Sequence, residues 1–201
     1  MKSRNTLVLS AKRVVALLTL MMALTSLSFG KGNSNFPNIK IKNFGQMDER
    51  FYRGGQPKED DYKSLADLGI KTVIDLRDDP TSYEKRSVEA LGMRYVNIPM
   101  SDSDYPKATQ IDAFLKLVDD PSTGKFYVHC AGGRHRTGVM GAVYRYTHNK
   151  WNFDQVYAEM KQYDFYTRFG HGAMKKYVED YGQQMQKPAV SAQQAAAVSN
   201  K

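Results

Sequence analysis

The sequence predicts an α/β fold with a central, mostly parallel sheet flanked by helices. Four short segments, 51–55, 70–76, 93–99 and 126–130, have the length and composition of strands. A segment with helical periodicity separates each of them from the next. Because parallel strands need a crossover connection that is usually a helix, this alternation indicates a parallel sheet.

Three helices are expected between the strands. The first begins at Asp60 or Asp61 and ends at Gly69, the second covers 82–92, and the third runs from Thr109, as its cap, through 118. The residues expected to face the core are Leu65, Leu68, Val88, Leu91, Ile111, Phe114, Leu115 and Val118. These helices supply the layers that a parallel sheet requires on its faces.

The chain after Gly138 is predicted to be helical almost throughout. The segment 139–149 is apolar nearly all round and therefore predicts a buried central helix. Asn152 is a candidate cap for a helix over 152–163, and 173–182 forms the last helix.

The first thirty residues differ in composition from the rest. A basic start precedes an apolar run that is short for a spanning helix, so we expect 1–30 to be a cleaved signal peptide. An uncleaved segment that tethers the protein to a membrane is the alternative. Cleavage would give an exported protein, with the periplasm as its expected location and no membrane span in the mature form. Four basic and no acidic residues would leave, which lowers the formal net charge from +8 to +4 and still favours anionic ligands.

The rest of the chain is expected to form one domain. Residues 31–50 are interpreted as a leader segment, 51–186 as the domain, and 187–201 as a disordered tail rich in Ala, Gln and Ser. No run of Lys and Arg interleaved with aromatic residues is present, so no nucleic-acid partner is expected.

Cys130 is the single cysteine, so no internal disulfide is possible. It stands at the predicted carboxyl end of a strand, where ligands bind in open α/β sheets. Five residues, two of them glycines, separate it from Arg136, at the start of a helix. Such a turn can direct backbone N–H groups at an anion, and Arg136 can hold two phosphate oxygens. The same positive field favours the thiolate, which is the nucleophilic form. A buried, inert cysteine is the alternative.

Two further roles in phosphoryl transfer need residues outside the turn. Asp102 or Asp104, in the loop after the strand 93–99, is a candidate donor of a proton to the leaving oxygen. The hydroxyl of Thr137, next to Arg136, is a candidate to assist release of the phosphate from sulfur.

The segment HCAGGRHRTG (129–138) resembles the HCxxGxxRTG loop of the cysteine-dependent protein tyrosine and dual-specificity phosphatases. The resemblance covers roughly 51–181. It is closest to the atypical plant and fungal branch, to which YRGGQP (52–57) and KWNFDQVYAEM (150–160) are also similar, and to bacterial exported relatives. It implies a tyrosine-phosphatase-like fold, with the phosphate-binding loop between a strand and a buried helix.

The resemblance also implies roles for the residues of the loop. Cys130 is the nucleophile, and Arg136 binds the phosphate together with the turn formed by Ala131, Gly132, Gly133, Arg134 and His135. The family spacing favours Asp102 as the acid and leaves Asp104 as the second candidate. Arg134 either contacts a second phosphate or is solvated, and His135 either contacts a ligand or stabilises the loop. His129 braces the loop in this family.

The expected function is hydrolysis of phosphate monoesters through a phosphocysteine, with protein phosphotyrosine as the expected substrate and phosphoserine and phosphothreonine as additional candidates. An inositol polyphosphate or pyrophosphate phosphatase is the alternative, and a catalytically inactive phosphate-binding module is the alternative of another class. The partner is thus a phosphorylated protein or a small phosphorylated metabolite. No cofactor is expected, and no metal, since His148 and His171 have no ligand at suitable spacing.

Overall fold

The computed structural model describes residues 36–187. The expected signal peptide lies outside the described residues, as do residues 31–35 of the expected leader and all but Lys187 of the expected tail. Within the described residues, no helix is both long and apolar enough to cross a bilayer.

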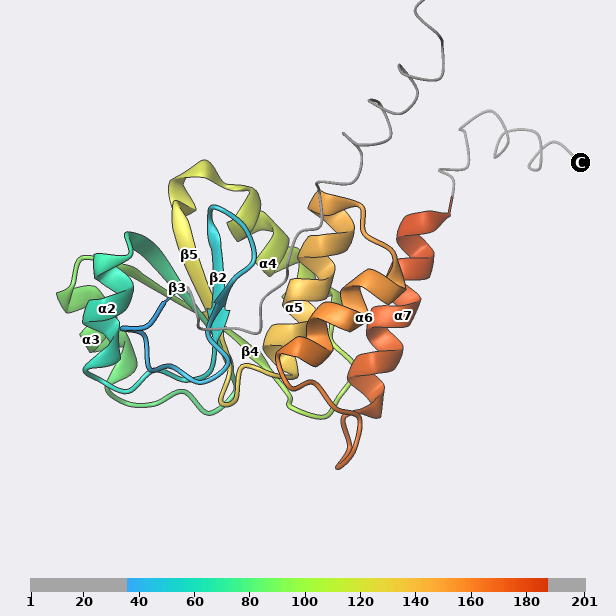
Figure 1. Cartoon of the computed structure of the whole chain (residues 1–201), viewed down its shortest axis with the longest axis horizontal. Helices are drawn as coiled ribbons and strands as arrows, with labels where there is room; N and C mark the ends of the chain where they lie inside the picture. The colour runs from blue at the N-terminus through green and yellow to red at the C-terminus, as the bar shows by residue number, and fades with distance from the viewer. Residues whose placement is uncertain (1–35, 188–201) are drawn as a thin grey trace, which may run out of the picture. The chain divides into compact units, whose positions relative to one another are not determined.

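The centre of the fold is a five-stranded sheet with the order β1-β2-β5-β3-β4 (Figure 1). Its strands are β1 (Gly45–Gln46), β2 (Phe51–Gly54), β3 (Ile70–Arg77), β4 (Arg94–Met100) and β5 (Lys125–His129). Only the short β1 is antiparallel to its neighbour, and the other pairs are parallel. The predicted fold class is confirmed, and β5, which leads to Cys130, lies in the middle of the sheet.

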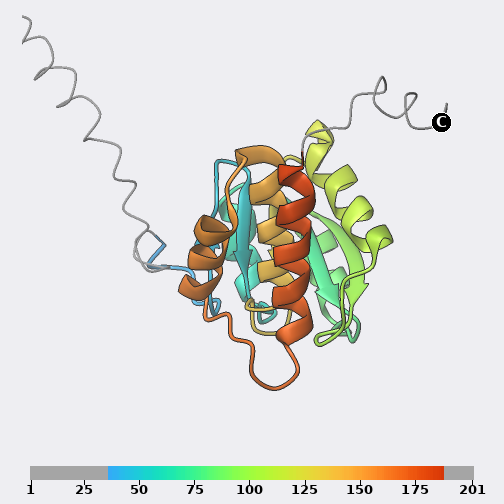
Figure 2. The same ribbon diagram turned by 90° about the vertical axis from the view of Figure 1, so that its right-hand side faces the viewer.

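Helices cover both faces of the sheet (Figures 1 and 2). On one face lie α2 (Asp61–Asp67) and α3 (Glu84–Ala90); on the other lie α4 (Ala108–Asp119), α5 (Arg136–Tyr144), α6 (Phe153–Gln162) and α7 (Gly172–Gln186). A single π-helical turn, Arg145–Asn149, extends α5, and a 3₁₀ turn, Pro121–Thr123, precedes β5. Every residue of α5 is buried, as are Arg145 and Tyr146, which confirms the prediction for most of the segment 139–149. His148 and Asn149, at the end of that segment, are exposed. Asn152 caps α6, as expected, by accepting a hydrogen bond from the Gln155 amide.

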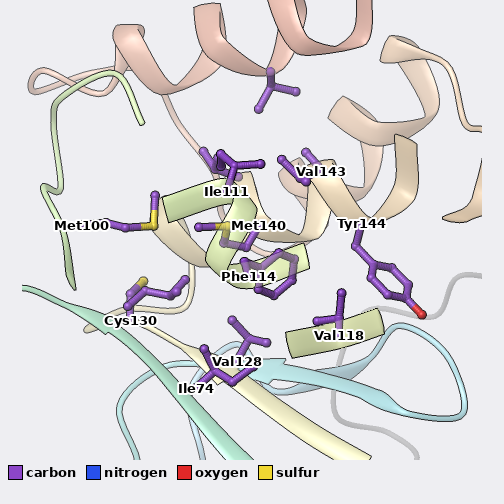
Figure 3. Close-up of a cluster of buried hydrophobic side chains, with 14 of the residues drawn as sticks. Ile74, Met100, Ile111, Phe114, Val118, Val128, Cys130, Met140, Val143 and Tyr144 are labelled. Atoms are coloured by element: carbon purple, nitrogen blue, oxygen red, sulfur yellow. The ribbon is translucent and has the colours of Figure 1, made fainter. Parts of the chain in front are cut away.

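Two apolar clusters fill the space between the sheet and the helices. The larger contains side chains from β3, β5, α4, α5 and α7, and Figure 3 shows Cys130 at its edge, near Met100. The smaller lies on the α2 and α3 side and includes Tyr62, Leu65 and Tyr127. The nucleophile candidate is therefore fixed by a packed core behind it.

The fold differs from the sequence prediction in three further places. Leu91, expected to face the core, is 42% exposed, because α3 ends at Ala90 and Leu91 lies beyond its last turn. Lys107, rather than Thr109, is at the cap of α4, where its amide donates a 2.8 Å hydrogen bond to the Gln110 side chain. The packed fold also begins before residue 51, since Ile39, Ile41 and Phe44 are buried and β1 belongs to the sheet.

Candidate active site

The catalytic loop, residues 130–136, connects β5 to α5 and is held from outside through its carbonyl groups. Asn43 Nδ2 donates to the Gly132 carbonyl at 2.8 Å, Arg53 Nη2 to the Gly133 carbonyl at 2.8 Å, and the Gln56 amide to the Ala131 carbonyl at 3.2 Å. A trans peptide points its N–H away from its carbonyl. The amides of the following residues, Gly132, Gly133 and Arg134, therefore face the inside of the loop, where the sequence predicts an anion site.

Gly133 is required by this arrangement. Its φ is +68°, which favours glycine, and a Cβ at this position would lie 2.3 Å from the carbonyl carbon of Gly54. The catalytic loop can approach β2 this closely only because residue 133 has no side chain. Gly132 is different, since a Cβ there would meet only the Arg134 side chain, at 3.7 Å.

The thiol of Cys130 is 3% exposed and lies at the floor of the loop. Burial alone would raise the pKa of the thiol, but the hydroxyl and amide of Thr137 favour the thiolate, as do the charge of Arg136 and the amide of Gly133. The pKa of Cys130 consequently lies below its ordinary value. The structure thus places Thr137 beside the sulfur, in the position needed for its expected role.

Arg136 is held by a residue that the sequence analysis missed. Its Nη1 donates to Asp78 Oδ1 at 2.7 Å and to the Met100 carbonyl at 3.0 Å. Both of these hydrogen bonds use Nη1. Nε and Nη2 donate to no other described residue, so these two nitrogens are available to two oxygens of a phosphate. Asp78 is not singled out in the sequence analysis. Its position after β3, next to β5 in the sheet, is the signal that points to the site.

Asp102 and Asp104 both lie in the loop between β4 and α4, and both are exposed. The negative charge of Asp102 acts on His135 in the catalytic loop. Asp104 lines a pocket of about 220 Å³ together with Asp78, Tyr105 and Lys107. Both carboxylates are therefore at the end of the sheet where the catalytic loop lies, and the choice of acid between them stays a prediction.

His135 packs against the segment that precedes α7 instead of pointing freely into the site. Its Nε2 lies 3.1 Å from the Tyr166 carbonyl, and its ring is stacked on that of His171 with centroids 3.5 Å apart. Burial, followed by the nearby His171, lowers the pKa of His135 to about 4, so its imidazole is neutral at pH 7. These contacts favour the loop-stabilising alternative for His135.

Arg134 remains partly exposed. Its Nη2 lies 3.8 Å from Asp164 Oδ2, and its guanidinium carbon is 5.8 Å from the centre of the Tyr166 ring. The ion pair is long and its carboxylate is 60% exposed, so it holds Arg134 weakly. Arg134 can therefore still turn to a ligand.

A buried network supports the catalytic loop from behind. His129 Nε2 lies 2.7 Å from Glu84 Oε1 and 3.9 Å from Asp75 Oδ1, with all three side chains inaccessible to solvent. Gln56 donates to Glu84, and Tyr95 donates to Asp75. His129 thus braces the residue next to Cys130, as the resemblance implies. Sequence analysis missed Glu84 and Asp75 because one lies in a helix and the other inside a strand.

These three side chains are also the one group in the described chain with ligand atoms close enough to hold a metal ion. Their contacts are those of a buried ion pair. Burial lowers the pKa of His129, but Glu84 and Asp75 more than compensate and raise it above its ordinary value. The 2.7 Å contact between His129 Nε2 and Glu84 Oε1 is consistent with this pairing.

A loop that cradles an anion, lowers the pKa of a buried thiol and presents an arginine fork defines the class of cysteine-dependent phosphatases. The family model described as "DSP-PTPase phosphatase fused to NAD+ Kinase" matches residues 34–180. The chain belongs to this family of the cysteine-dependent tyrosine and dual-specificity phosphatases, and it is a hydrolase.

Curated relatives carry related names. Probable tyrosine-protein phosphatase DG1060 of Dictyostelium discoideum is 28% identical over 131 residues, which are 63% of this chain and 78% of that protein. NAD kinase 2, chloroplastic, of Arabidopsis thaliana is 35% identical over 96 residues, which are 45% of this chain and 10% of that protein. The second match concerns a small part of a much longer protein.

Solved structures show the same fold. The catalytic core of the PP-IP phosphatase SIW14 of S. cerevisiae, in complex with citrate, aligns with a TM-score of 0.62 and 18% identity over 80% of this chain and 93% of that one. A variant of TpbA of P. aeruginosa, in complex with pTyr, aligns with a TM-score of 0.53 and 20% identity over 78% and 90% of the two chains.

Proposed function

We propose that this phosphatase acts on phosphotyrosine in proteins. The observation that carries the proposal is the contrast between a buried nucleophile candidate and exposed aromatic side chains in two of the neighbouring loops. Cys130 is 3% exposed, whereas Phe169, in the segment before α7, is 83% exposed and Tyr105, in the loop after β4, is 49% exposed. A phosphotyrosine reaches further than a phosphoserine, and its ring can pack on aromatic side chains. The name of the Dictyostelium relative is consistent with this substrate class.

The proposed reaction has two steps. The Cys130 thiolate attacks phosphorus, a P–S bond forms and the P–O bond to the tyrosine breaks, while Asp102, or else Asp104, protonates the leaving oxygen. Arg136 and the loop amides bind the three non-bridging oxygens. The same carboxylate then accepts a proton from water as the water attacks phosphorus, and the P–S bond breaks. The Thr137 hydroxyl stabilises the departing thiolate.

Phosphate release from a substrate panel tests this proposal. The full chain is assayed in EDTA with a phosphotyrosine peptide, a phosphoserine peptide and inositol hexakisphosphate, and Cys130→Ser is assayed in parallel. We expect preference for phosphotyrosine and no turnover by Cys130→Ser. Phe169→Ala should lower kcat/KM for phosphotyrosine, whereas Leu91→Ala, which also removes an exposed apolar side chain but just after the end of α3, should not. Equal use of phosphoserine and phosphotyrosine would contradict the proposal.

An inositol polyphosphate or pyrophosphate is the second candidate substrate. The observation in its favour is the weakly held Arg134, which can bind a second phosphate; the name of the yeast structural neighbour is consistent with it. Preference for inositol hexakisphosphate, lost in Arg134→Ala, would support this candidate and contradict the first. Binding of vanadate without release of phosphate from any substrate would indicate a binding module instead.

We also propose that the protein is exported and that the periplasm is its location. The support is the composition of residues 1–30, a basic start followed by a short apolar run. Expression of the full chain followed by N-terminal sequencing tests this. A soluble product that begins near residue 31 is expected, and an intact N-terminus in the membrane fraction would indicate the tethered alternative.

A further inference from the structure

The segment that precedes α7 connects the catalytic loop to the loop that carries the candidate acids. Figure 1 shows the segments after β4 and β5 and the segment between α6 and α7 at the same end of the molecule. His171, in the last of these, contacts both of the others. Its Nδ1 lies 2.7 Å from the Asp102 carbonyl, and its ring stacks on that of His135.

The chemistry of these contacts fixes where the hydrogens are. A carbonyl oxygen only accepts hydrogen bonds, so Nδ1 of His171 donates to Asp102. By the same reasoning, Nε2 of His135 donates to the Tyr166 carbonyl at 3.1 Å. His135 is thereby fixed to the segment before α7, and its ring, stacked at an angle of 15°, fixes the ring of His171.

We propose that His171 is a positioning residue that holds Asp102 in place for proton transfer to the leaving group. The inference rests on the proposed assignment of Asp102 as the acid. Asp102 is exposed, and its carboxylate makes no hydrogen bond to any other described residue, so its position depends on its backbone. The hydrogen bond from His171 Nδ1 to the Asp102 carbonyl joins that backbone to the segment that packs on the catalytic loop.

Other contacts attach the same loop to the same part of the molecule. The Tyr105 hydroxyl donates to Asp180 Oδ2 at 3.1 Å, and the Tyr105 ring packs edge-on against that of Tyr177, 4.9 Å away. Tyr105 therefore fixes one end of the loop to α7, while His171 fixes the end nearer to the catalytic loop.

The dependence of rate on the leaving group tests this role. The leaving group of 4-nitrophenyl phosphate is the anion of a phenol with a low pKa, and it leaves without a proton. Phenol, like the tyrosine side chain, has a pKa of about 10, so the leaving group of phenyl phosphate needs a proton. Misplacement of the acid therefore lowers kcat/KM for phenyl phosphate much more than for 4-nitrophenyl phosphate. A merely structural role would lower both equally.

The decisive variant is His171→Phe, which keeps a ring to stack on His135 and removes the Nδ1 donor. We expect kcat/KM for phenyl phosphate to fall about tenfold or more, a part of the 10²–10⁴ that general acids contribute, with little change for 4-nitrophenyl phosphate. His148→Ala is the matched control, because His148 also stacks on an aromatic ring, Tyr144, and pairs with a carboxylate, Asp119, outside the site. It should not alter the ratio between the two substrates.

Asp102→Asn, Asp104→Asn and the double variant Asp102→Asn/His171→Phe separate the possible outcomes. We expect Asp102→Asn to show the leaving-group-dependent loss and the double variant to show no further loss. If Asp104→Asn shows the leaving-group-dependent loss of kcat/KM instead, Asp102 is not the acid, and the inference about His171 is wrong as well. If Asp102→Asn shows that loss but His171→Phe lowers kcat/KM equally for both substrates, or for neither, Asp102 remains the acid and only the inference about His171 is wrong.

Discussion

The guanidinium of Arg53, which is 1% exposed, donates a 2.8 Å hydrogen bond to the carbonyl of Gly133. It also lies 3.9 Å from the centre of the Tyr163 ring. Burial lowers the pKa of Arg53, so the fold loses free energy by keeping this charge inside. What this buried cation in β2 provides is a fixed donor that orients the Gly133 peptide of the catalytic loop.

Arg53→Met should therefore impair both folding and catalysis. It leaves the Gly133 carbonyl without its donor, which costs about 1–3 kcal/mol, and allows that peptide to turn its amide away from the phosphate site. We expect a lower midpoint of thermal unfolding and a large loss of kcat. Arg50→Met is the control, because Arg50 donates to the carbonyls of Gly124 and Asp120, away from the catalytic loop. Unchanged kcat in Arg53→Met would show that the bond has no role in catalysis.

Gly133→Ala should be far more disruptive than Gly132→Ala. The first adds a Cβ 2.3 Å from the backbone of Gly54 at a φ of +68°, whereas the second adds one 3.7 Å from a flexible side chain. A left-handed conformation alone costs about 1–2 kcal/mol in a residue with a side chain. Chemical denaturation of both variants measures the difference. Equal stability of the two would contradict the loop geometry.

Thr137→Val should raise the pKa of the Cys130 thiol. The Thr137 hydroxyl favours the thiolate, and valine keeps the shape but cannot donate. The rate of alkylation by iodoacetamide as a function of pH reports the thiolate directly, and its midpoint should move to higher pH. If the midpoint does not move, the loop amides and Arg136 suffice to lower the pKa.

Glu84→Gln should destabilise the fold in a pH-dependent way. Burial opposes the charge on both partners, yet the pKa of Glu84 is lowered from its ordinary 4.5 and that of His129 is raised from its ordinary 6.5. The pair thus contributes fully between about pH 4.5 and 6.5. Its contribution falls at lower pH as Glu84 is protonated, and at higher pH as His129 loses its proton.

Removal of one partner of a buried pair costs about 3–5 kcal/mol. We therefore expect the free energies of unfolding of the Glu84→Gln variant and of the wild type to differ most within that pH window. Glu89→Gln in the same helix is the control, because Glu89 pairs only with exposed Lys85, at 4.0 Å. A difference that is constant from pH 4 to pH 9 would contradict a charged Glu84–His129 pair.

The part of the site that is contiguous in sequence was predictable, and the part assembled by the fold was not. Cys130 begins the turn between β5 and α5, and Arg136 and Thr137 are the first two residues of α5, so spacing and glycine content sufficed to single them out. Arg53, Asp78 and His171 come from a strand, a turn and a segment far away in sequence, and only the strand order and the packing of α7 bring them together. The prediction that Leu91 faces the core is wrong for a related reason, since periodicity does not show where a short helix ends.

Trapping of the phosphoenzyme tests the central claim, that Cys130 is the nucleophile of a metal-independent phosphatase. The full chain is mixed with a ³²P-labelled aryl phosphate in EDTA, quenched with acid and digested, and the labelled peptide is sequenced. The account predicts label on Cys130 in the wild type and none in Cys130→Ser, which should still bind vanadate. Label on another residue, or wild-type phosphate release by Cys130→Ser, would contradict it.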